Sequence, residues 1–284
     1  MNSFIEKIQH QFKTATIVEQ FIYINIFVFV LSYLVNSFSF LMNMGDNFVF
    51  NWFSLPANFE DFISKPWTLF TYGFLHGGFI HILFNLIVLF YFGNLFLDFF
   101  SKKDFLIYFF SGIVAGGLIF MLSYNYFPAL KNDPSYLVGA SAGITAIVVG
   151  IATKVPNYAL HFRFIGGIKL WHIAVAFVML DVVQIPVSNT GGHLAHIGGA
   201  IIGFILTNQF DSTAKKTSLF STIFKSRKQK PLKTVYKKPK SASSNTTTSS
   251  QQHKIDTILD KISKSGYETL TKEEKDFLFS VGKK

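Results

Sequence analysis

Apolar segments long enough to lie in a bilayer are the feature that most limits what this chain can fold into. Half of its 284 residues are hydrophobic and 35 are Phe, whereas only 15% are charged, so most of the chain cannot form a water-facing surface. Hydropathy indicates six spans, of which the fourth and the last are short. They lie at about 18–37, 69–98, 104–127, 139–154, 168–187 and 193–210. The sequence therefore predicts an all-α polytopic membrane protein.

The charged residues are distributed unevenly along the chain. Residues 1–210 hold 9 Lys/Arg and 9 Asp/Glu, whereas the tail from residue 211 holds 17 and 7, so the net charge of +10 lies entirely in the tail. By the positive-inside rule the tail is cytoplasmic, where it is also able to contact anionic membrane lipids. Six spans then place both termini inside. The basic charge gives no indication of nucleic acid binding, and the absence of Cys excludes disulfides and thiolate sites.

Four segments follow from this pattern. Residues 1–17 form a charged N-terminal segment ahead of a first span that we interpret as a retained helix, and residues 18–210 form the membrane domain. Residues 211–252 are polar and basic, which indicates a flexible linker that the chemistry of the membrane domain does not require. Residues 253–284 are predicted to form a small helical appendage, with one helix ending near Gly266 and a second opened by a capping box at Thr271 to Glu274.

Polar side chains near the starts of three spans are the candidate functional residues. Ser141 and His196 lie in small-residue sequences of the fourth and sixth spans, while His81 and Asn85 share one face of the second. These three spans run in the same direction in a six-span bundle, so the four residues lie at similar depth. A hydroxyl, an imidazole and amide donors at one point are the groups that acyl transfer needs. Ser141 is also expected in the first turn of its helix, where free backbone N–H groups favour an oxyanion.

At these residues the chain resembles the rhomboid family of intramembrane serine proteases. The resemblance covers about residues 18–210 and implies a six-helix rhomboid-like bundle in a bacterial cytoplasmic membrane, with both termini inside. It rests on the Gly-x-Ser motif ending at Ser141, the Ala-His-x-Gly-Gly motif around His196, and the pattern of His76, His81 and Asn85.

The resemblance also implies the roles of these residues. It implies a dyad of Ser141 and His196 without a third acid, and an oxyanion hole made by Asn85, His81 and the Ser141 backbone N–H. His76 is expected to be a structural donor. No cofactor or metal is implied, and the substrate is a transmembrane or membrane-anchored protein cut in or near its membrane segment. Close helix packing is expected at Gly139, Gly143, Gly199 and Gly203.

Three positions depart from the family pattern. Ala142 follows the serine where Gly is usual, and Thr145 stands where many members place an aromatic ring beneath the imidazole. Thr68 replaces the Arg that usually follows the tryptophan matched by Trp67. Both Ala142 and Gly143 are small, so close approach of the helices is still expected.

Parts of the sequence are also compatible with functions other than proteolysis. A non-catalytic rhomboid-like protein that binds and routes membrane clients is the main alternative, and the intact Ser and His argue against it. A transporter predicts internal repeats or broken helices, which are not evident. His193 and His196 have a spacing that suits a metal, but the sequence shows no evident third ligand. Asp181 is expected near the outer interface without a functional role. An unidentified partner for the C-terminal appendage is also expected, since about 30 residues bury little core alone.

Overall fold

The chain consists of two separate helical units. The computed structural model describes residues 2–45, 47–131, 133–163, 166–212 and 247–281. The N-terminal unit comprises residues 1–225 and the C-terminal unit residues 226–284. The predicted linker at 211–252 lies largely outside the described residues.

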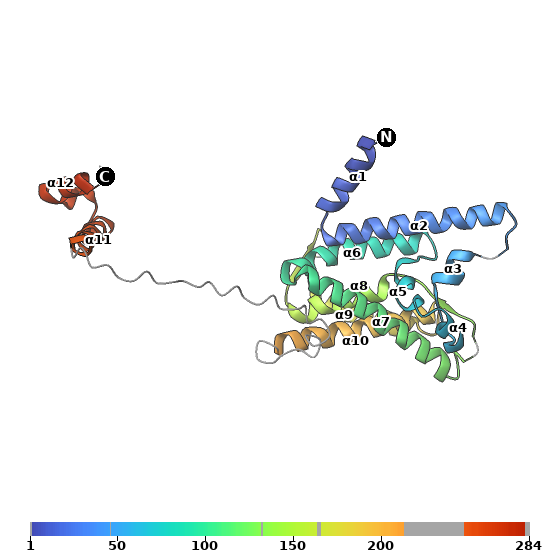
Figure 1. Ribbon diagram of the computed structural model, residues 1–284. Helices are drawn as coiled ribbons and strands as arrows, with labels where there is room; N and C mark the ends of the chain where they lie inside the picture. Colours follow the sequence, from blue (N-terminus) through green and yellow to red (C-terminus); the bar gives the residue numbers. More distant parts are fainter. Residues whose placement is uncertain (1, 46, 132, 164–165, 213–246, 282–284) are drawn as a thin grey trace, which may run out of the picture. The chain divides into compact units, whose positions relative to one another are not determined.

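Six apolar helices make up most of the N-terminal unit (Figure 1). Within the described residues, four are long and apolar enough to cross a membrane: α2 (Ile17–Leu41), α6 (Phe79–Phe99), α7 (Lys102–Tyr126) and α10 (Thr190–Ser212). Two shorter apolar helices are α8 (Ser141–Lys154) and α9 (Leu170–Gln184). Each of the six overlaps one predicted span. The number of crossings and the cytoplasmic placement of both termini stay predictions.

The predicted second span was wrong at its start. Helix α6 begins only at Phe79, and the apolar residues before it form α5 (Thr68–Thr71) and a 3₁₀ turn, η1 (Tyr72–Phe74). Four residues separate this turn from α6, the last two of them glycines, and Gly78 is fully extended with φ 176°. Hydropathy registers the apolar side chains but not this break in the backbone.

The last span was wrongly predicted to be short, because α10 has 23 residues. The predicted start leaves out the first three residues of α10, Thr190 to Gly192, whose hydropathy is low, and the next residue, His193, is polar as well. In the structure its ring is hydrogen-bonded to a carboxylate of α9, so the helix accommodates it.

Shorter elements connect these helices. Strand β1 (Leu55–Pro56) pairs with β2 (Tyr136–Leu137), with Leu55 opposite Leu137, and so joins the segment before α6 to the one before α8. The prediction of an all-α fold omitted these short strands. The remaining elements are α1 (Asn2–Thr14), α3 (Phe48–Phe53), α4 (Phe59–Ser64), and the hairpin of β3 (Ala159–Phe162) with β4 (Gly166–Lys169).

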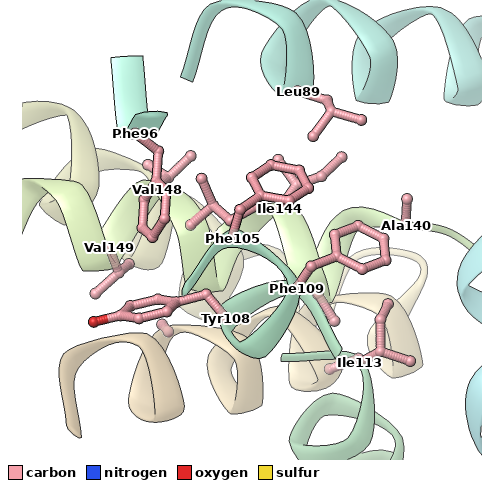
Figure 2. Close-up of a cluster of buried hydrophobic side chains, with 14 of the residues drawn as sticks. Leu89, Phe96, Phe105, Tyr108, Phe109, Ile113, Ala140, Ile144, Val148 and Val149 are labelled. Atoms are coloured by element: carbon pink, nitrogen blue, oxygen red, sulfur yellow. The ribbon is translucent and has the colours of Figure 1, made fainter. Parts of the chain in front are cut away.

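The core lies where α6, α7 and α8 meet. Figure 2 shows Phe96 of α6, Phe105 and Phe109 of α7, and Ile144 of α8 directed into one apolar cluster. Helix α2 closes the cluster, because the ring of its Phe21 meets that of Phe109 edge-on at 4.8 Å between centroids. Interlocking rings of this kind fix the spacing of neighbouring helices.

Helix α8 is covered on every side. Its consecutive residues Ala142–Ala152 are all buried, which leaves no face for solvent or lipid. Helix α7 runs antiparallel to it at close range, since a Cβ on Gly116 would lie 2.6 Å from that of Ala142, and a Cβ on Gly112 would lie 2.7 Å from that of Ala146. Small residues thus allow the two backbones to approach.

The C-terminal unit is a helical hairpin of α11 (Thr247–Ser265), a 3₁₀ turn η3 (Tyr267–Thr269) and α12 (Lys272–Val281). The predicted capping box is confirmed, because Thr271 and Glu274 exchange backbone-to-side-chain hydrogen bonds. Glu274 also accepts two hydrogen bonds of 2.9 Å from Lys261 of α11, which lower the pKa of its carboxyl. Helix α11 begins inside the predicted linker, because its first residues are polar and carry no apolar periodicity.

Candidate active site

The backbones of α8 and α10 are in direct contact beside the two candidate catalytic residues. A Cβ on Gly199 would clash with the carbonyl oxygen of Ala142, and one on Gly203 would clash with that of Ala146. Two turns of each helix therefore touch in the same order, so the helices run parallel. Ser141 immediately precedes the first contact on α8, and His196 lies one turn before it on α10.

Because of this contact, Gly199→Ala is expected to destabilise the protein. Ala is favoured over Gly within a helix by about 1 kcal/mol. Overpacking costs about 1–3 kcal/mol, and here the obstacle is a backbone carbonyl that cannot rotate away. We therefore expect a net loss of stability, measured by unfolding in detergent. Gly77→Ala is the matched control, because its Cβ would lie 3.8 Å from Val138, an ordinary contact. Equal stability of the two variants would contradict the prediction.

Ser141 is the first residue of α8, as expected. The turn before it needs a glycine, because Gly139 has φ +128°, and the Gly139 N–H donates to the carbonyl of Tyr72 over 2.9 Å. Thr145 Oγ1 donates to the carbonyl of Ser141 over 2.8 Å. Local hydrogen bonds thus hold the start of the helix. As in any α-helix, the backbone N–H groups of the first turn have no intrahelical acceptor. Gly143, two residues after Ser141, lies against Phe109 of α7.

His81 reaches the same point from α6. A Cβ on Gly139 would lie 2.8 Å from Nε2 of His81 and 3.4 Å from Oγ of Ser141, so both side chains border the space beside this glycine. The ring of His76 meets that of His81 edge-on, with centroids 5.1 Å apart. His76 is fully buried, and neither of its nitrogens makes a hydrogen bond of ordinary geometry with the described residues.

Asn85 lies one turn below His81 on α6 and is buried. Its Nδ2 has no hydrogen-bond partner among the described residues. A buried amide donor without a partner is costly, so such a group calls for an explanation. An acceptor that is present only during a reaction would supply one.

His196 is held by an acid that the sequence interpretation did not assign to it. Its Nδ1 lies 2.7 Å from Oδ1 of Asp181 on α9, and Nδ1 of His193 lies 2.8 Å from the same oxygen. The sequence showed no evident third ligand beside His193 and His196, and the structure brings the carboxylate of Asp181 to both rings. The resemblance implied no acid beside His196, yet this structure has one. The contact was not evident from the sequence because Asp181 and His196 are 15 residues apart and a loop lies between them.

Ser141 and His196 themselves are not hydrogen-bonded to each other within the described part of the chain. Catalytic hydrogen bonds are often long in enzymes without substrate and shorten in the complex. His81 and His196 lie close enough for their rings to interact electrostatically. The geometry thus gathers side chains from α6, α8, α9 and α10 at one end of the helix bundle.

Comparison with known proteins agrees with this arrangement. The model of the rhomboid domain matches residues 64–210, which is just over half of the chain and contains every residue of the site. The chain belongs to the rhomboid family. Family membership and the four long apolar helices also identify an integral membrane protein.

One curated relative is "RHOMBOID-like protein 12, mitochondrial" of Arabidopsis thaliana. The two sequences are 26% identical over 149 residues, which make up 49% of this chain and 44% of the relative. The chain thus matches less than half the length of that protein. A second family model, a family of unknown function (DUF6576), matches residues 243–283 and so covers the C-terminal hairpin.

Proposed function

We propose that this rhomboid-family protein is an intramembrane serine endopeptidase. Ser141 is the nucleophile and His196 the general base, and the substrates are transmembrane or membrane-anchored proteins cut in or near their membrane segment. No cofactor takes part. We further propose a bacterial cytoplasmic membrane, as the family resemblance implies, and the distribution of Lys and Arg supports an orientation with the basic tail inside.

The observation that carries this proposal is the backbone contact of α8 with α10 at Ala142 and Gly199. This contact brings Ser141 and His196 to the same end of two parallel helices. The unpartnered Nδ2 of Asn85 supports the same conclusion, because an oxyanion hole needs a donor that is not already engaged.

The chemistry proceeds in two steps. Ser141 Oγ attacks the scissile carbonyl while its proton passes to Nε2 of His196, and the oxyanion accepts hydrogen bonds from Asn85, His81 and the Ser141 N–H. His196 then gives the proton to the leaving amine, which leaves an acyl ester on Ser141. Water, activated by the same ring, hydrolyses the ester and restores the free enzyme.

The proposal is tested with the full chain in liposomes. A fluorescent fluorophosphonate is expected to label the wild-type protein at Ser141, and a panel of model transmembrane substrates is expected to be cleaved. A folded protein that is neither labelled nor active would instead favour the non-catalytic alternative, a membrane protein that binds and routes clients.

A further inference from the structure

The carboxylate of Asp181 is a buried charge-bearing group in an otherwise apolar helix. The side chain is only 11% exposed, and α9 carries no other Asp or Glu and no Lys or Arg. A carboxylate in such a position is costly and needs compensation. Both compensating contacts come from α10, and both reach the same oxygen: Nδ1 of His193 and Nδ1 of His196.

The distances identify these contacts as hydrogen bonds. Zinc binds nitrogen and oxygen at about 2.0–2.1 Å in a tetrahedron, which separates neighbouring ligand atoms by about 3.3 Å. The observed separations of 2.7 and 2.8 Å are shorter and match N–H···O⁻ bonds instead. The three side chains thus form a hydrogen-bonded network.

This network sets the tautomer of His196. A ring that donates from Nδ1 to a carboxylate keeps its lone pair on Nε2, so Nε2 is the basic atom. The carboxylate also stabilises the ring when it becomes positively charged, and it holds the ring plane in one orientation. All three effects favour a general base at Nε2.

We propose that Asp181 is a positioning residue for proton transfer, which makes the site a Ser141–His196–Asp181 triad. This inference rests on the proposed function. The proton of Ser141 moves to Nε2 of His196 and then to the leaving amine, while Asp181 keeps accepting the hydrogen bond from Nδ1. His193 has a different role, because it gives the same carboxylate oxygen a second donor and takes no part in proton transfer.

Asp181→Asn tests the triad. The amide presents an N–H to Nδ1, which favours the tautomer with its proton on Nε2, so we expect kcat to fall by about 10²- to 10⁴-fold with little change in KM. The rate of fluorophosphonate labelling at Ser141 is expected to fall in parallel. Asp181→Glu restores the carboxylate and is expected to recover part of the lost kcat.

His193→Gln is the matched control within the same network. It removes one of the two hydrogen bonds between α9 and α10 but leaves the bond to His196. If the network only joined the helices, the activity of each variant would fall in proportion to its loss of stability. We expect His193→Gln to keep kcat within about threefold of wild type, since the tautomer of His196 is unchanged.

A measurement on the wild-type protein covers the case in which Asp181→Asn does not fold. Selective ¹⁵N labelling of histidine, with His196 assigned by its loss in His196→Gln, is expected to show the proton on Nδ1. A proton on Nε2, normal kcat in Asp181→Asn, or loss of wild-type activity on adding a chelator would overturn the triad. These outcomes differ from failure of the proposed function, in which the wild-type protein shows no Ser141-dependent labelling or cleavage.

Discussion

Ser141→Ala and His196→Ala are each expected to lower the rate of substrate cleavage by at least about 10⁴-fold, because neither group has a substitute. The double variant is expected to be little worse than either single variant, since nucleophile and base act as one unit. Cleavage of a model transmembrane substrate in liposomes provides the measurement, with unfolding curves to verify that each variant is folded.

Two further variants control for the loss of a polar group: one removes a buried hydroxyl and the other an exposed imidazole. Ser32→Ala removes a buried hydroxyl of α2 that bonds only its own helix, at Phe29. His172→Ala removes an exposed imidazole at the start of α9, packed on Trp171. Both are expected to keep wild-type activity. Substantial turnover by Ser141→Ala would rule out Ser141 as the nucleophile.

Asn85→Ala is expected to lower kcat by roughly 10- to 1000-fold, the range for removal of one oxyanion donor. The effect on KM should be small, because the oxyanion exists only near the transition state. The folded protein should lose little stability, since Nδ2 of Asn85 has no hydrogen bond to lose among the described residues. Steady-state kinetics of substrate cleavage give both constants.

Asn94→Ala makes the same change on the same helix, where Nδ2 of Asn94 donates to the carbonyl of Phe90. We expect its kcat to be unchanged. If Asn85→Ala also had normal kcat, the side chain of Asn85 would serve only packing, and His81 with the Ser141 N–H would have to stabilise the oxyanion.

The sequence predicted the elements whose signal is local. Apolar runs located all six helices, and the small residues at Gly199 and Gly203 indicated close packing, because both patterns repeat along one helix. Helix ends set by backbone breaks were missed, as at Gly78, where hydropathy continues through the turn. The first residues of α10, Thr190 to Gly192, were missed for a different reason: they are polar or small, so their hydropathy is low.

Contacts between distant segments were beyond sequence reasoning. Asp181 looked isolated because its partners lie 12 and 15 residues further on, across a loop whose course no local pattern specifies. The free Nδ2 of Asn85 was likewise invisible, since the absence of a partner depends on every neighbouring helix. Residue types thus suggested which groups carry chemistry, whereas the fold decided how they are paired.

The complete enclosure of α8 has a consequence for biogenesis. This helix of 14 residues is about 21 Å long, shorter than the hydrocarbon layer, and all of Ala142–Ala152 is covered by protein. It therefore gains little from lipid, and its stability depends on α7 and on α10, which the ribosome makes about 50 residues later. We expect α8 to reach its final depth only after α10 has been synthesised. A nascent chain stalled before Thr190 should leave a cysteine introduced at Ala146 open to a water-soluble thiol reagent, and protection at that stage would show that α8 inserts on its own.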